Sequence, residues 1–209
     1  MKKSSKYLIG WFEDMDINVK QFIEENIGLI ESNRWDEIYK KSDDLKADVG
    51  NFTKAMLDAD IHPENYLSDL PIHFLRGSNI SEFEIPNNIK SIGKYAFTCC
   101  YNLTSVTIGN NITSIGECSF EHCYSLTSIE IPDNVREISW HTFSDCPRLT
   151  YVNIPTSVRR IDEYAFFECK NLNISYAGTT TQWQNLAGNA FQGATYICNC
   201  IDGILKKEL

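Results

Sequence analysis

Residues 126–138 read Leu-Thr-Ser-Ile-Glu-Ile-Pro-Asp-Asn-Val-Arg-Glu-Ile, and this stretch decides the fold. Apolar Ile129 and Ile131 alternate with polar neighbours, and a period of two is typical of a strand that buries one face. Pro132 then ends the strand, because proline cannot donate to a central ladder, and the Asp-Asn pair after it favours a turn. The stretch therefore predicts a short strand and a turn within one coil of a larger structure.

The same pattern returns every 23 residues, without an insertion, over the units 80–102, 103–125, 126–148 and 149–171. A single coil cannot bury its apolar edge, whereas stacked coils form a continuous core lined by rows of equivalent side chains. The sequence therefore predicts a leucine-rich-repeat solenoid of four coils. Its parallel strands are expected near 81–85, 104–108, 127–131 and 150–154.

Four of the eight cysteines form one such row, which consists of Cys100, Cys123, Cys146 and Cys169. Stacked strands lie ~4.8 Å apart, and a disulfide requires Cβ atoms ~3.8 Å apart, so parallel side chains in this row favour free thiols. Cys198 and Cys200 should share one face of a late strand, with no further metal ligands nearby. We therefore expect buried, reduced cysteines and no metal site.

The two ends depart from the repeat and are expected to cap it, giving an α+β fold. Residues 1–79 carry apolar side chains at helical spacing, which predicts an all-helical N-terminal capping domain, with its third helix near 43–59 and its last short helix ending at Gly77. An independent helical binding domain is the alternative. Residues 172–209 predict a short C-terminal cap: a strand that loses one residue of register, a helix capped by Thr180 or Thr181, and a final strand with a turn.

The stretch 126–138, together with Ala165-Phe166 and the cysteine row, resembles the BspA-like leucine-rich repeat family, and the resemblance covers residues 80–172. It implies a curved solenoid associated with protein or surface binding. Three positions depart from the pattern: Gly109 replaces the proline in the second unit, and Ser139 and Asp162 replace the glycine seen at Gly93 and Gly116.

Composition restricts the possible functions. The net charge is −9, and neither the N-terminal part nor the repeats are basic, which argues against direct nucleic-acid binding. No apolar run approaches the ~20 residues of a membrane span, and the apolar stretch near the start is too short for a signal sequence, so we expect a cytoplasmic protein. Phosphate-binding, metalloprotease and hydrolase motifs are missing, so we expect neither enzyme activity nor a cofactor.

A binding site is therefore expected on the solenoid surface. The outward strand positions vary while the core positions do not, and the exposed Trp140 is a side chain typical of binding hot spots. We predict a non-catalytic protein-binding module whose partner carries a basic surface; the oligomeric state is left open. The alternatives are a phage-type inhibitor that uses an acidic surface against a host enzyme or nucleic-acid-binding factor, and a surface adhesin-like protein. The predicted strand residues are Glu82, Glu84, Ser105, Thr107, Ser128, Glu130, Tyr151 and Asn153.

Overall fold

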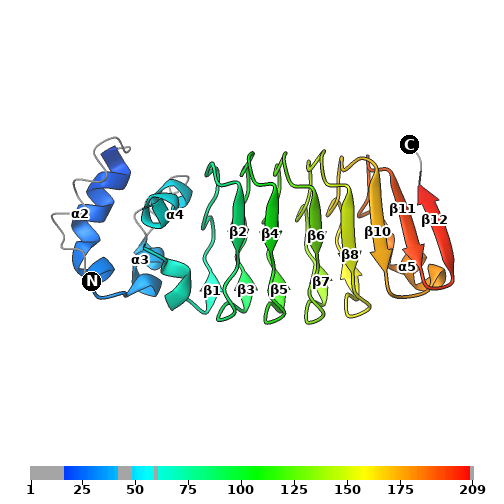
Figure 1. The fold of residues 1–209 in the computed structure, drawn as a ribbon, viewed down its shortest axis with the longest axis horizontal. Helices are drawn as coiled ribbons and strands as arrows, with labels where there is room; N and C mark the ends of the chain where they lie inside the picture. The colour runs from blue at the N-terminus through cyan, green and yellow to red at the C-terminus, as the bar shows by residue number, and fades with distance from the viewer. Residues whose placement is uncertain (1–16, 42–48, 59–60, 208–209) are drawn as a thin grey trace.

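The N-terminal part of the chain is helical. The structure is a computed structural model that describes residues 17–41, 49–58 and 61–207, and Figure 1 shows the N-terminal helices at one end of a row of coils. Helices α2 (Ile17–Glu31), α3 (Trp35–Lys41) and α4 (Val49–Asp58) precede the short 3-10 helix η3 (Pro63–Tyr66). Phe22 packs edge-on against Phe52, and Trp35 is buried with them. The predicted helix near 43–59 is observed over 49–58, and 42–48 and 59–60 lie outside the described residues.

One strand from each coil contributes to the main side of the solenoid, as predicted. β2 pairs in parallel with β4, β6 with β8, β8 with β10 and β10 with β11, while β12 returns antiparallel to β11. We call the outward side chains of these seven strands the strand face. The strands are β2 (Glu82–Glu84), β4 (Ser105–Thr107), β6 (Ser128–Glu130), β8 (Tyr151–Ile154), β10 (Leu172–Tyr176), β11 (Tyr196–Cys200) and β12 (Gly203–Lys207).

A second series of two-residue strands runs along another side of the coils, and each of its pairings is parallel. It arises where the chain returns to the core after the turn, so the last residue of each strand is buried: Leu70 in β1 and an isoleucine in the other four. These strands are β1 (Asp69–Leu70), β3 (Ser91–Ile92), β5 (Ser114–Ile115), β7 (Glu137–Ile138) and β9 (Arg160–Ile161).

Both series are interrupted at the same place, between the unit 103–125 and the unit 126–148. β4 and β6 belong to different sheets, and so do β5 and β7. Ser139 replaces the repeat glycine here, and its hydroxyl donates to the Ile115 carbonyl at 3.0 Å. In the preceding unit, the backbone amide of Gly116 makes the equivalent bond to the Ile92 carbonyl. The coils have a third side, made of turns, which we call the turn side. Backbone hydrogen bonds still join the two units there, for example from Phe120 N to Thr142 O at 2.9 Å.

The core consists of stacked rows. Consecutive phenylalanine rings lie 5.0 Å (Phe97–Phe120), 5.4 Å (Phe120–Phe143) and 5.3 Å (Phe143–Phe166) apart, and Phe191 extends the stack at 4.8 Å. All five rings are fully buried.

The cysteine row is buried and its thiols are free, as expected. Each thiol donates to a backbone carbonyl of the preceding coil, for example Cys123 to Phe97 at 3.2 Å and Cys169 to Phe143 at 3.1 Å. Burial raises the pKa of Cys100 and of Cys169 to about 12, and it raises the pKa of Cys123 and Cys146 well above the ordinary thiol value. The thiolate, which is the reactive form, is therefore suppressed along the whole row.

Native protein should accordingly keep these four thiols protected from a thiol reagent such as dithionitrobenzoate at pH 8. Denatured protein should expose all eight cysteines. The measurement is the number of thiols titrated within minutes with and without denaturant, followed by mass spectrometry to locate the label. Rapid native labelling of the whole row would contradict the stacking described above.

The coils continue beyond the four predicted repeats, to about six turns. Ahead of them, β1 pairs with β3, and Leu75 N donates to Ala96 O at 2.7 Å, the bond that Phe97 makes to Ser119 one coil later. The expectation that a short helix ends at Gly77 is therefore wrong, because this segment is a coil turn. Whether 1–79, 80–171 and 172–209 behave as separate domains stays a prediction.

Gly77 instead belongs to a row of left-handed residues on the turn side. Its φ is 70°, and the equivalent positions have positive φ in every coil. A side chain costs energy in this conformation, so glycine suits it best. The row consists of Gly77, Cys99, His122, Asp145, Glu168 and Gly193.

The C-terminal cap contains the expected elements. β10 loses one residue of register, since Asn173 pairs with Tyr151. Helix α5 (Thr180–Ala187) is capped by Thr179, whose hydroxyl accepts from Gln182 N at 3.3 Å, so the prediction of Thr180 or Thr181 was wrong. Thr180 is used differently: its amide donates to Asp202 Oδ1 at 2.7 Å and ties the helix to the last turn.

Candidate functional site

The predicted strand residues form two parallel rows. Glu82 pairs with Ser105 and Ser128 with Tyr151, while Glu84 pairs with Thr107 and Glu130 with Asn153. Seven of the eight are exposed and Asn153 is half-buried. The residues between them, such as Ile129 and Val152, point into the core. The register therefore places all eight predicted side chains on the strand face; whether they bind a partner stays a prediction.

The strand face is longer than the predicted four strands. β10, β11 and β12 add three positions to each row. Seven strands at ~4.8 Å give a face about 30 Å long, instead of the ~20 Å expected from four coils. The added residues are Asn173, Ile197 and Lys206 in one row and Ser175, Asn199 and Ile204 in the other.

Charge is distributed unevenly along this face. The acidic side chains Glu82, Glu84 and Glu130 lie toward the helices, and none of them makes an ion pair within the described part of the chain. The opposite end carries Lys206, which is exposed, and Lys207, whose ammonium donates to the Phe191 carbonyl at 2.6 Å. The face is therefore acidic at one end and cationic at the other, where the sequence had suggested an acidic face only.

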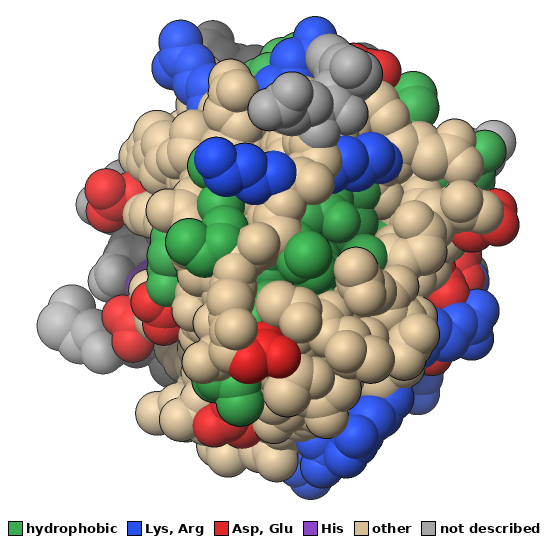
Figure 2. All heavy atoms as spheres, turned by 90° about the vertical axis from the view of Figure 1, so that its right-hand side faces the viewer, with side chains coloured by type: hydrophobic (Ala, Val, Ile, Leu, Met, Phe, Trp, Pro, Cys, Tyr) green, Lys and Arg blue, Asp and Glu red, His purple; other side chains and the backbone are tan. Residues whose placement is uncertain are grey.

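A hollow of about 600 Å³ lies on the cationic end of the strand face. Asn199 and Asn173 line it and are joined by a hydrogen bond of 2.6 Å. Ile197 (43% exposed) and Ile204 (62% exposed) also line it. Figure 2 shows apolar side chains gathered at this end of the molecule beside Lys and Arg side chains. Sequence reasoning missed this part of the face, because it lies beyond the 23-residue period.

Trp140 lies on the turn side, away from the strand face. Its carbonyl accepts from Cys118 N, its indole ring is 45% exposed, and it lies 3.9 Å from the His141 ring. His141 is flanked by Glu121 at 3.5 Å and by Tyr164, whose ring lies 5.3 Å away. The expectation of an exposed Trp140 is thus met, on a surface separate from the strand rows.

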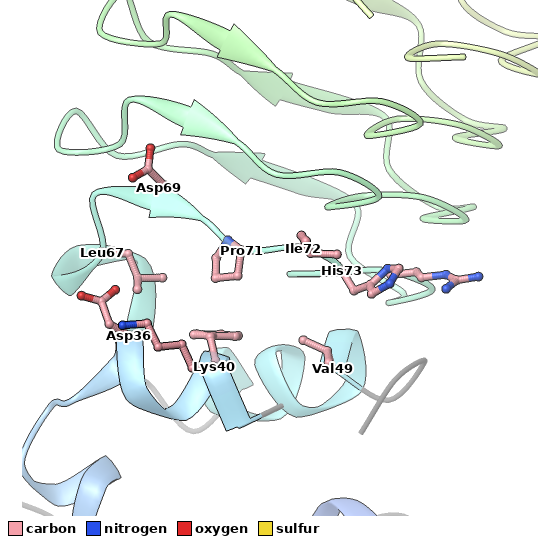
Figure 3. Close-up of a pocket in the computed structure, with 10 residues that line it drawn as sticks. Asp36, Lys40, Val49, Leu67, Asp69, Pro71, Ile72 and His73 are labelled. Atoms are coloured by element: carbon pink, nitrogen blue, oxygen red, sulfur yellow. The ribbon is translucent and has the colours of Figure 1, made fainter. Parts of the chain in front are cut away.

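A second hollow, of about 580 Å³, lies between the helices and the first coil. Figure 3 shows Asp36 and Lys40 of α3 on one side of it and Pro71, Ile72 and His73 of the first coil on the other. Its lining mixes acidic, basic and apolar groups without a surplus of one kind. We interpret it as part of the junction between the cap and the solenoid.

The described residues contain no arrangement suited to catalysis by the neighbouring His122 and Cys123. The Cys123 thiol points into the core, where it donates to the Phe97 carbonyl, and His122 lies 3.8 Å from Asp145 instead. Within 17–41, 49–58 and 61–207, no three His, Cys, Asp or Glu side chains are grouped so that they could hold a metal ion. None of the described helices is long and apolar enough to cross a membrane.

Comparison with known proteins identifies the repeat. A family model for the BspA type leucine rich repeat region matches residues 68–198 in six copies. No curated protein matches the chain.

Two solved structures are similar to it. A leucine rich cell surface protein from Faecalibacterium prausnitzii is 26% identical over 56% of this chain and 36% of that one, with a TM-score of 0.47. A leucine rich repeat protein from T. pallidum is 26% identical over 52% of each chain, with a TM-score of 0.51. The chain thus spans about a third to a half of these proteins. The family match supports a repeat-based binding module, and leucine-rich repeat proteins are typically non-catalytic and generally mediate protein interactions.

Proposed function

Because the chain belongs to the BspA-type leucine-rich repeat family, we propose that it is a non-catalytic module that binds a protein partner through the strand face. The observation that carries this proposal is the pair of outward rows, which run in register over a core of repeated side chains. Within each of the two sheets of the strand face, the paired strands present varied side chains at fixed positions. Such preorganisation lowers the entropic cost of binding.

The partner is expected to carry basic groups opposite Glu82, Glu84 and Glu130. Charges on the two surfaces then attract each other during approach, so association should become slower as salt rises. An inhibitor that acts through a uniformly acidic surface fits less well, because Lys206 lies on the same face.

We also place the protein in the cytoplasm as part of this proposal. Its cysteines are free thiols within the described structure, and the row thiols are hydrogen bonded to backbone carbonyls. Reduced thiols are the rule in that compartment. The alternative location is the cell surface. Fractionation of the source cell, with the chain detected by an antibody, distinguishes a cytoplasmic protein from a surface protein.

The test of the proposed function is a double variant, Glu130→Lys with Tyr151→Ala. It reverses one exposed charge and removes the aromatic side chain of the neighbouring strand, both outside the core. We expect partner binding to weaken at least tenfold, which corresponds to ~1.4 kcal/mol, while thermal unfolding stays unchanged. The partner is first isolated from the source cell on immobilised wild-type protein, and its affinity for both proteins is then measured by calorimetry.

Trp140→Ala serves as the matched control, because it removes an exposed aromatic side chain from the turn side. It should leave the affinity within twofold of the wild type. Loss of binding in Trp140→Ala alone would move the site to the turn side. Intact binding in both variants would exclude both surfaces and direct the search to the N-terminal helices.

A further inference from the structure

The hollow at the cationic end of the strand face has the composition of an anchor site. Ile197 lies directly opposite Lys206, and Asn199 directly opposite Ile204. Ile197 and Ile204 are therefore diagonal neighbours, ~7–8 Å apart, and both lie on the β12 side of the Asn173–Asn199 hydrogen bond. Exposed apolar side chains that gather around a hollow, with a polar rim, are typical of a binding site.

The charge at the rim indicates what kind of group accompanies the apolar one. The Lys207 ammonium donates a hydrogen bond to the Phe191 carbonyl within the chain. The Lys206 side chain projects onto the exposed face, and no ion pair holds it among the residues that the structure describes. The nearby Asp202 is bonded to Thr180. The charge left for a partner at this end is therefore positive and is complementary to a carboxylate.

We propose that this hollow anchors an extended polypeptide segment through one apolar side chain of that segment next to an Asp or Glu. The proposal rests on the proposed function and assigns the two ends of the strand face different tasks. The apolar side chain lies between Ile197 and Ile204, and the carboxylate pairs with Lys206. Lysine on an edge strand such as β12 discourages pairing of that edge with another strand, so the segment lies across the face.

The spacing of the strands predicts the spacing of the partner's residues. Four strand intervals separate β12 from β6, which carries Glu130, and six separate it from β2, which carries Glu82 and Glu84. At ~4.8 Å for each interval these distances are about 19 Å and about 29 Å. An extended chain covers ~3.3 Å for each residue. The segment should therefore carry Lys or Arg about six to nine residues away from its apolar-acidic pair.

The experiment is a selection from a random sixteen-residue peptide library displayed on phage, with the full chain immobilised. Enriched sequences should contain an apolar residue next to Asp or Glu and a basic residue about six to nine positions away. An enriched peptide is then synthesised with a fluorophore, and its affinity is measured by anisotropy. Failure to enrich this pattern overturns the proposal.

Variants locate the bound peptide. Ile204→Asp and Ile197→Asp should each weaken binding at least tenfold. Ile201→Asp is the matched control: it makes the same change at a side chain that is 72% exposed and does not line the hollow, and it should stay within twofold. Lys206→Glu should weaken binding, and a peptide with Lys in place of its carboxylate residue should recover it.

The outcomes separate the anchor site from the proposed function. If Glu130→Lys weakens peptide binding and Ile204→Asp does not, the strand face binds the peptide but the proposed anchor site is wrong. If neither variant has an effect, both proposals are wrong. A second copy of the chain is the other possible occupant of the hollow, and sedimentation of the chain without peptide tests for it. If the chain self-associates and Ile204→Asp abolishes that association, the hollow binds a second copy and the proposal is overturned.

Discussion

Replacing Phe143 with alanine is expected to lower the free energy of unfolding by about 3–5 kcal/mol, from lost burial and the cavity left behind. The ring is fully buried and lies between Phe120 and Phe166, at 5.4 and 5.3 Å. The backbone of this coil is hydrogen-bonded to the following coil on three sides, so the site cannot fully collapse to fill the space. Urea unfolding followed by circular dichroism measures the change.

The matched control is Tyr124→Ala. Tyr124 also stacks on the equivalent ring of the adjacent coil, Tyr101, at 5.0 Å, but it is 45% exposed. Its loss should cost less than ~1 kcal/mol, because little area is removed from water. Equal effects of the two substitutions would mean that ring stacking, and not enclosure, stabilises the rows.

The substitution Gly50→Ala is expected to destabilise the contact between the helices and the first coil by about 1–3 kcal/mol, the usual cost of overpacking. Gly50 is buried in α4, and a Cβ built there would overlap the backbone of Arg76 in the first coil. Helix and coil must move apart to admit the methyl group. Hydrogen exchange should therefore become faster in α4 and in residues 72–77.

Gly28→Ala is the control: it adds the same methyl group to a helical glycine but is expected to stabilise the protein. Gly28 is exposed in α2, and nothing lies within 4 Å of the position of an added Cβ. Alanine is favoured over glycine in a helix by ~1 kcal/mol, so this variant should be slightly more stable. If Gly50→Ala is also neutral or stabilising, the described contact between α4 and Arg76 is wrong.

The sequence was sufficient to predict the central coils, because a strict period makes each row visible. The strands, the cysteine row and the outward position of Glu130 and Tyr151 all follow from that period. The end coils were missed because their spacing changes. Leu75 and Phe97 occupy equivalent positions 22 residues apart, and Phe166 and Phe191 stack 25 apart. The left-handed position of Gly77 and Gly193 gave no signal either, because Cys99, His122, Asp145 and Glu168 occupy it in the central coils.

The candidate site could be predicted only in part for the same reason. The hollow depends on the hairpin that pairs Ile197 with Lys206, and no periodic signal placed β12 against β11. Helix capping shows a second limit. The sequence predicted Thr180 or Thr181 as the cap of α5, but Thr179 forms it in a capping box with Gln182, while the Thr180 amide bonds to Asp202, 22 residues further on.

The interruption of both strand series between the units 103–125 and 126–148 has a mechanical consequence. In a linear array, each coil is held only by its neighbours, so the total stability is a sum of interfaces and the weakest one is the first to open. Here one junction lacks the strand pairing of both series and relies on the turn side, the Phe120–Phe143 stack and single hydrogen bonds, such as Ser139 Oγ to Ile115 O and Thr127 N to Thr104 O. Under tension along its length, the solenoid should therefore behave as two stiff rods joined by a compliant link, and Tyr151 with the hollow would stay on one rod while Glu82 and Glu84 stay on the other.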